Sequence, residues 1–176
     1  MPDTTRRERF EQVVLPHLDA AYSLARWLTR NEQDAQDVTQ EAFLRAFRFF
    51  DGYQGGSLRA WLLTIVRNTC YTWLRHNRPA GSLAEFNEEI HSPEFPSAAD
   101  PEFQLLARAD RETLRHALEE LPEIFREVII LREMEGMSYK EIADVASISI
   151  GTVMSRLARA RTRLRDVLCA PQGKES

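Results

Sequence analysis

The chain has 176 residues, 43% apolar and 28% charged, a composition that excludes a largely disordered chain and leaves room for one ordinary domain or two small ones. The sequence has neither an apolar leader nor a run of roughly 18 apolar residues, so we expect an unexported, cytoplasmic protein. Its net charge of −4 conceals two regions of opposite charge. Residues 151–165 hold five arginines and no acidic residue, whereas residues 85–102 hold several acidic residues and no lysine or arginine.

The residue types that carry chemistry are sparse. The two cysteines, Cys70 and Cys169, lie far apart, and the four histidines have no partner at ligand spacing, so we expect no disulfide, metal site or cofactor. We find no nucleophile beside a base and no phosphate-binding glycine loop after a strand. An enzyme is therefore disfavoured.

In the first half, apolar residues recur at helical spacing and no segment alternates with period two, which predicts an all-α protein. A first helix is expected over residues 14–28. A second should run from an Asn31 N-cap to about Phe50. The glycine-bearing residues 51–56 predict a loop, and Ser57 is expected to cap a third helix over residues 58–76.

Four prolines with acids and serines predict a flexible linker over residues 79–104, between small helical domains at 1–78 and 105–170. In the second domain, helical spacing returns from Phe103, and another helix is expected over 123–134. Ser138 and Glu141 form a capping box that opens a short helix through Val145. A four-residue turn and a final helix over about 151–168 complete a predicted helix-turn-helix.

The helix-turn-helix predicts contacts to duplex DNA, because its second helix enters the major groove. Five apolar residues are expected to pack its helices together: Ile142, Ala143, Ile148, Val153 and Leu157. Four polar residues are then expected to face outward, toward phosphates and base edges: Thr152, Ser155, Arg156 and Arg159. Further along, Arg161, Arg163 and Arg165 suit the DNA backbone or a partner.

Two features of the first domain leave alternatives open. Asp34, Asp37 and Glu41, with Gln40 beside them, form an acidic stripe that is either a solvated face or a docking surface. The third helix combines cations with an aromatic residue, which suits single-stranded DNA but is weak on its own. These residues are Arg59, Arg67, Asn68, Tyr71 and Arg75.

Residues 34–47 (DAQDVTQEAFLRAF) and 61–68 (WLLTIVRN) resemble the polymerase-binding and promoter-melting segment of extracytoplasmic-function (ECF) sigma factors of the sigma-70 family. Leu121-Pro122, residues 131–143 (LREMEGMSYKEIA) and residues 151–161 (GTVMSRLARAR) resemble that family's promoter-reading domain. Both similarities occur in the family's order and spacing.

The resemblance implies three partners: core RNA polymerase through its β′ clamp and β subunits, promoter DNA, and an anti-sigma factor. The polymerase-binding residues would be Asp34, Asp37, Gln40 and Glu41. The minus-10 residues would be Tyr53, Gln54, Ser57, Arg59, Arg67, Asn68 and Tyr71. The minus-35 residues would be Thr152, Met154, Ser155, Arg156, Arg159 and Arg163. Met154 and Gln54-Gly55-Gly56 depart from the family's common pattern, so the promoter sequence cannot be copied from a relative.

The main alternative is a helix-turn-helix regulator that acts without being a polymerase subunit. A two-component response regulator ends in a similar motif but begins with an alternating α/β receiver domain. A helical adaptor is a further alternative, which gives the arginine-rich helix no role.

Overall fold

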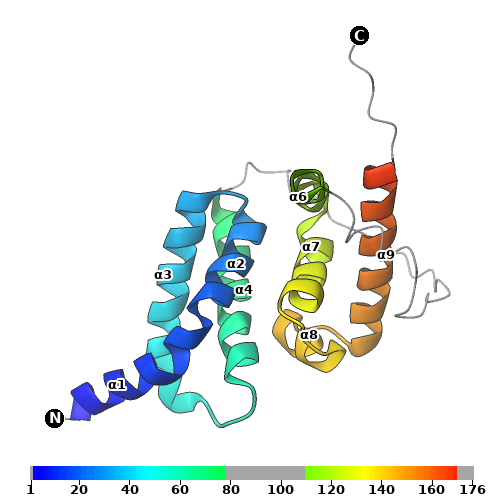
Figure 1. The fold of residues 1–176 in the computed structure, drawn as a ribbon. Coiled ribbons are helices and arrows are strands. Elements are labelled where there is room, and N and C mark those ends of the chain that lie inside the picture. The colour runs from blue at the N-terminus through cyan, green and yellow to red at the C-terminus, as the bar shows by residue number, and fades with distance from the viewer. Residues whose placement is uncertain (1, 78–109, 170–176) are drawn as a thin grey trace.

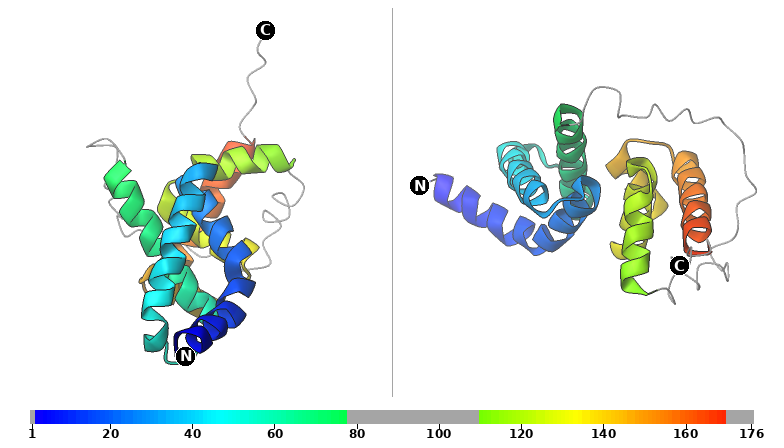
Figure 2. Two further views of the ribbon diagram at one scale, coloured as in Figure 1. Left: turned by 90° about the vertical axis from the view of Figure 1, so that its left-hand side faces the viewer. Right: turned by 90° about the horizontal axis from the view of Figure 1, so that it is seen from above.

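A computed structural model describes residues 2–77 and 110–169. Within these two ranges every regular element is a helix, as the sequence predicts, and the α/β receiver of a response regulator is excluded for residues 2–77. The helices form two groups that lie side by side in Figure 1 and in the right-hand view of Figure 2. We call α1–α4 the N-terminal group and α6–α9 the C-terminal group. The predicted linker, residues 79–104, lies outside the described residues.

The N-terminal group begins with α1 (Pro2–Val14), a 3₁₀ turn η1 (Leu15–His17) and α2 (Leu18–Thr29). The prediction of one continuous helix over 14–28 is wrong, because the chain changes direction at η1 (Figure 2). Pro16 explains the break, since proline has no N–H to donate within a helix and is tolerated only in a first turn. The helix α1 in the charged N-terminal segment was not predicted.

The joints that follow agree with the sequence. Asn31 accepts a hydrogen bond from the Asp34 N–H (3.0 Å) and starts α3 (Glu32–Phe49). A 3₁₀ turn η2 (Phe50–Gly52) and a loop lead to α4 (Leu58–Asn77), where the Ser57 hydroxyl accepts from the Ala60 N–H (3.2 Å). The predicted caps therefore form, and each satisfies a backbone donor that its helix leaves unpaired.

The C-terminal group consists of α6 (Arg111–Glu120), α7 (Glu123–Ile129), a π-helical turn η3 (Ile130–Met134), α8 (Tyr139–Ala146) and α9 (Ile150–Cys169). The predicted helix 123–134 has the expected extent, but its last turn is π-helical: Glu135 N–H donates to Ile130 O (3.2 Å). The Ser138 and Glu141 capping box is confirmed. Ser147 ends α8 in the left-handed conformation, and α8 and α9 form the predicted helix-turn-helix.

Each group buries its own apolar residues. Leu24, Leu28, Leu62 and Val66 are fully buried in the N-terminal group. The residues predicted to join α8 to α9 are buried or packed against the core, as expected: Ile142, Ala143, Ile148, Val153 and Leu157. The two groups also pack on each other, chiefly α4 on α8 and α2 on α7. This contact determines which candidate DNA-binding residues are accessible.

Candidate nucleic-acid interface

The acidic stripe lies on the open side of α3. Asp37, Gln40 and Glu41 are exposed and Asp34 is half-buried, while the opposite face buries Val38, Ala42 and Ala46. A groove of about 240 Å³ between α3 and α4 is lined by Asp37, Glu41, Arg45 and Trp73 among others. A second groove, of about 420 Å³ between α2 and α3, is lined by Gln40, Tyr22 and Phe43 among others. The stripe therefore forms a ridge between two grooves, and such a surface can receive a basic partner.

The loop before α4 is held by a contact within it and by contacts to α4 and α1. The hydroxyl of Tyr53 donates to the carbonyl of Gly56, and the Tyr53 ring lies 5.4 Å from that of Trp61. Gly55 and Gly56 have φ values of 95° and 87°, which favour glycine, while Gln54 and Ser57 are exposed. Arg6 of α1, which sequence reasoning missed, pairs with Asp51 at 2.9 Å and so ties α1 to this loop.

Two of the cations of α4, Arg59 and Arg67, are engaged by the C-terminal group. Arg67 donates two hydrogen bonds to the carboxylate of Glu127 in α7, from Nε to Oε2 (2.9 Å) and from Nη2 to Oε1 (3.2 Å). Its guanidinium also lies 4.1 Å from the centre of the Tyr71 ring. Arg59 donates to the Glu135 carbonyl (2.8 Å) and lies 3.7 Å from the Glu141 carboxylate. Of the residues assigned to single-stranded DNA, only Asn68 and Arg75 are exposed.

Glu127, which the sequence analysis did not single out, lies at the centre of the contact between α4 and the C-terminal group. Its side chain is fully buried, and Arg156 of α9 lies 3.9 Å from it. Burial raises the pKa of the Glu127 carboxyl even though Arg67 and Arg156 favour its ionised form. Burial lowers the pKa of Arg67, but the hydrogen bond and charge of Glu127 outweigh this, so that pKa is raised overall.

The helix α9 carries the residues predicted for duplex DNA. Ser149 accepts from the Thr152 N–H (3.1 Å) and caps the helix, a cap that the sequence analysis did not assign. Thr152, Met154, Ser155 and Arg159 are half-buried on α9. The prediction that Arg156 faces outward is wrong for this structure, because its side chain is 13% exposed and turned toward Glu127. The guanidinium of Arg163 lies 4.9 Å from the centre of the Phe125 ring.

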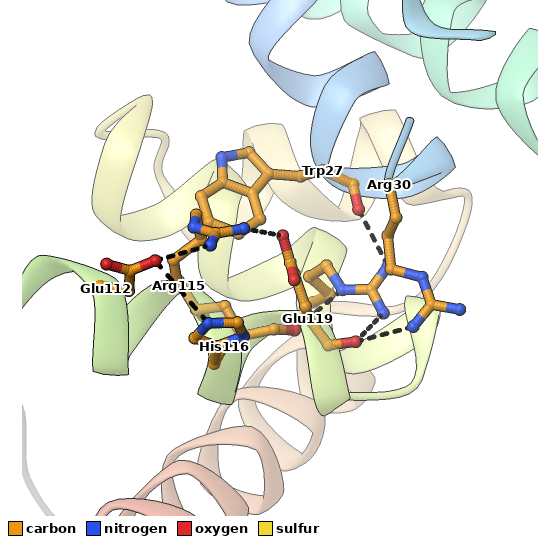
Figure 3. A network of polar contacts seen from close by, with 8 residues as sticks. Trp27, Arg30, Glu112, Arg115, His116 and Glu119 are labelled. Atoms are coloured by element: carbon orange, nitrogen blue, oxygen red, sulfur yellow. Dashed lines mark hydrogen bonds and ion pairs between the residues drawn. The ribbon is translucent and has the colours of Figure 1, made fainter. Parts of the chain in front are cut away.

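Arg126 of α7 is buried and connects the C-terminal end of α2 with the C-terminal end of α6 and with Leu121, which follows α6. It donates to the carbonyls of Leu118 (2.9 Å), Glu119 (3.0 Å) and Leu121 in its own group, and to that of Trp27 (2.9 Å) in α2. Beside it, Arg30 donates to the Glu119 carbonyl at 3.0 Å (Figure 3). These donors meet the C-terminal carbonyls of α2 and α6, where helix dipoles favour positive charge.

Two family models match the two groups in order. The model "Sigma-70 region 2" matches residues 13–79, and "Sigma-70, region 4" matches residues 111–164. The chain belongs to the sigma-70 family. Members of this family are transcription initiation factors, and the matched regions coincide with the acidic stripe, the loop, α4 and the helix-turn-helix.

Individual relatives assign the chain to the ECF group of sigma factors. It is 34% identical over 168 residues to the ECF RNA polymerase sigma factor SigE of Mycolicibacterium smegmatis, a match that covers 94% of this chain and 64% of SigE, just under two thirds. It is 35% identical over 170 residues to the RNA polymerase sigma-H factor of Pseudomonas aeruginosa, covering 92% and 87% of the two chains. The ECF sigma-E factor of Escherichia coli is 37% identical over 137 residues, 73% of this chain and 70% of that one.

Two solved sigma-factor structures share the fold. The sigma factor RpoE of Bartonella quintana, solved with the anti-sigma factor NepR, matches with a TM-score of 0.70 and 29% identity, covering 94% of this chain and 99% of that one. CnrH, solved with the cytosolic domain of CnrY, matches with a TM-score of 0.66 and 30% identity, covering 94% and 90%.

None of the helices within 2–77 and 110–169 is long and apolar enough to cross a membrane. In the same ranges no three histidine, cysteine or carboxylate side chains gather closely enough to hold a metal ion.

Proposed function

We propose that this chain is an ECF sigma factor that binds core RNA polymerase and directs it to a two-part promoter. The exposed acidic ridge of α3 supports this proposal most directly. The ridge lies within the matched region 2, and it is the opposite, apolar face of α3 that is buried in the core. The division into domains 1–78 and 105–170, with a linker between them, belongs to the same proposal.

Each surface takes one role in this proposal. Asp34, Asp37, Gln40 and Glu41 dock on the β′ clamp, with the β subunit as a further contact. The minus-10 element is met by the loop residues Tyr53, Gln54 and Ser57 and by Arg59, Arg67, Asn68 and Tyr71 of α4. The minus-35 element is read by residues of α9: Thr152, Met154, Ser155, Arg156, Arg159 and Arg163. The protein contributes binding energy only, and polymerase carries out the bond chemistry.

Control by an anti-sigma factor is part of the proposal. RpoE of Bartonella quintana was solved with such a partner, and the likeness to this chain extends over both groups of helices. A partner that covers the ridge of α3 would compete with polymerase. Substitutions in the ridge are therefore expected to weaken both complexes.

The test is run-off transcription by sigma-free core polymerase on randomised promoter templates, with and without this protein. Selection of one two-part promoter is expected. If core polymerase neither binds the protein nor initiates, while the protein alone binds duplex DNA, an ordinary helix-turn-helix regulator replaces the proposal.

A charge-reversed variant tests the ridge itself. Asp37→Lys should weaken capture of core polymerase by about tenfold or more, because like charges then face each other across the contact. Glu8→Lys is the matched control, since Glu8 is also an exposed acid and lies on α1, outside the ridge. Equal affinities of the two variants would refute the role of the ridge.

A further inference from the structure

The loop before α4, residues 53–57, is open in its middle. Among the described residues, and apart from its neighbours in the chain, no atom lies within 4 Å of the position that a Cβ would take at Gly55 or Gly56. The side chains of Gln54 and Ser57 are exposed. Packing therefore does not hold the middle of the loop, and its position depends on the contacts at its two ends.

The second end of the loop is fixed by α4. The hydroxyl of Tyr53 donates to the carbonyl of Gly56, and the Tyr53 ring lies 5.4 Å from the half-buried Trp61 of α4. The Ser57 hydroxyl accepts from the Ala60 N–H at 3.2 Å. These contacts join the end of the loop to the first turn of a helix whose inner face is buried in the core.

The first end of the loop is fixed by α1. The Nε of Arg6 donates to Oδ2 of Asp51 in η2 at 2.9 Å, and its Nη2 donates to the Phe47 carbonyl in the last turn of α3 at 2.6 Å. The guanidinium also lies 4.3 Å from the centre of the Phe47 ring. Hydrogen bonds from a cation to a carboxylate are stronger than neutral ones, and a helix C-terminus favours positive charge. One side chain thus connects α1, α3 and the turn that leads into the loop.

An aromatic cluster holds Arg6 in this place. Phe10 lies four residues along α1 from Arg6, on the same face of the helix. Its ring is buried and makes edge-to-face contacts with Phe47 (5.2 Å) and Phe50 (5.3 Å). Phe10 therefore anchors α1 against the end of α3 from which the loop leaves, and Arg6 faces Asp51 as a result.

We propose that Arg6 is a positioning residue for the minus-10 site: through Asp51 it fixes the start of the loop and so holds Gln54 where it can select a base of the melted strand. This inference rests on the proposed function, because that function makes the loop a base-binding element. Arg6 acts through the loop and does not itself contact DNA. A fixed loop discriminates between bases better than a mobile one, because flexible surfaces adjust to the wrong partner.

Four variants test this role. Arg6→Ala removes both hydrogen bonds, and Arg6→Lys keeps the charge but cannot make both contacts with the geometry of a guanidinium. Asp51→Asn removes the carboxylate and leaves Arg6 in place. Arg7→Ala is the matched control, because Arg7 is the next residue and its side chain pairs with Glu11 of α1 at 2.8 Å.

The backbone order parameters of Gly55 and Gly56, from ¹⁵N relaxation of the full free chain, measure whether Arg6 fixes the loop. A rigid backbone has an order parameter of about 0.85 and a flexible one has a value below about 0.6. Arg6→Ala and Asp51→Asn are expected to move both glycines from the first range toward the second, whereas Arg7→Ala should match the wild-type chain. Equal order parameters in Arg6→Ala and Arg7→Ala would overturn the proposal.

Run-off transcription with core polymerase measures base selection. Each variant is tested on the selected promoter, on templates with one substituted minus-10 base and on templates with one substituted minus-35 base. Arg6→Ala should lower the preference for the selected minus-10 base by about tenfold, the effect of losing one hydrogen bond to a charged group. Arg6→Lys should lower it less, and Arg7→Ala should not change it. The minus-35 preference should stay at its wild-type value, because partial unfolding would reduce transcription from every template alike.

The double variant separates positioning from a direct contact to DNA. If Arg6 acts through Asp51, adding Arg6→Ala to Asp51→Asn should cause little further loss of minus-10 preference, because both changes release the same loop. If the two losses multiply, Arg6 contacts DNA on its own and the positioning role is wrong. If Arg6→Ala does not fold by circular dichroism, Asp51→Asn and Arg6→Lys decide by the same measurements.

The wild-type chain separates failure of this inference from failure of the proposed function. If the proposed function is wrong, the wild-type chain itself does not initiate transcription with core polymerase, and the role of Arg6 in base selection is lost with it. If only the role of Arg6 is wrong, the wild-type chain and all variants initiate and share one minus-10 preference.

Discussion

Loss of Arg126 should destabilise the C-terminal group far more than loss of any exposed arginine. The side chain is 1% exposed and donates to four backbone carbonyls. The bonds to Leu118 and Leu121 are buried, whereas those to Trp27 and Glu119 are only part-buried. In Arg126→Ala, water can reach the second pair of carbonyls more readily than the first.

The expected loss of stability follows from the carbonyls of Leu118 and Leu121, which water does not reach in the variant. An unsatisfied buried polar group costs about 1–3 kcal/mol, so Arg126→Ala should lower the free energy of unfolding by about 2–6 kcal/mol. Arg126→Lys should recover part of this loss, because an ammonium keeps the charge but cannot reach all four carbonyls.

Urea denaturation followed by far-ultraviolet circular dichroism measures this cost. Arg115→Ala is the control, because the Arg115 side chain is 43% exposed and, among the described residues, its ion pairs are with Glu112 and Glu119 on its own helix (Figure 3). Such pairs contribute about 0.2–0.5 kcal/mol each. If Arg126→Ala costs no more than Arg115→Ala, the structural role assigned to the buried guanidinium is wrong.

Three smaller predictions concern single positions. Iodoacetamide should label Cys169 in the folded protein and spare Cys70, because burial raises the pKa of the Cys70 thiol to about 12; two labels by mass spectrometry on folded protein would contradict this. Ser138→Ala should lower the free energy of unfolding by about 1 kcal/mol in thermal or urea unfolding, since it removes the cap of α8. Ser138→Asp should retain most of the stability, because aspartate also caps helices. Gly136→Ala should cost about 1–2 kcal/mol because φ is 62°, and Gly52→Ala, with equally open space around it, is the control; equal costs would rule out backbone strain.

Local rules predicted most of the fold. The caps at Asn31, Ser57 and Ser138 depend on residues within one helical turn, and each forms as expected. The first helix was predicted as continuous because its apolar spacing passes through Pro16 without a change. The spacing of apolar residues carries no information about the missing N–H of proline. The π-helical turn η3 likewise leaves no mark in the apolar pattern.

The candidate site was predicted only in part, because its central contact joins residues 60 positions apart. One local signal was available: Arg126 and Glu127 interrupt the apolar run Ile124-Phe125 and Val128-Ile129, where both charges must be buried. Such a pair indicates that buried charges have partners, but it does not identify Trp27 or Arg67 as those partners. Periodicity describes one helix at a time, whereas this interface depends on how two groups of helices meet.

The ridge of α3 is accessible without any rearrangement of the chain. Asp37, Gln40 and Glu41 are exposed in the same structure in which Arg67 is engaged by Glu127. A partner can therefore reach the ridge without first separating the two groups of helices.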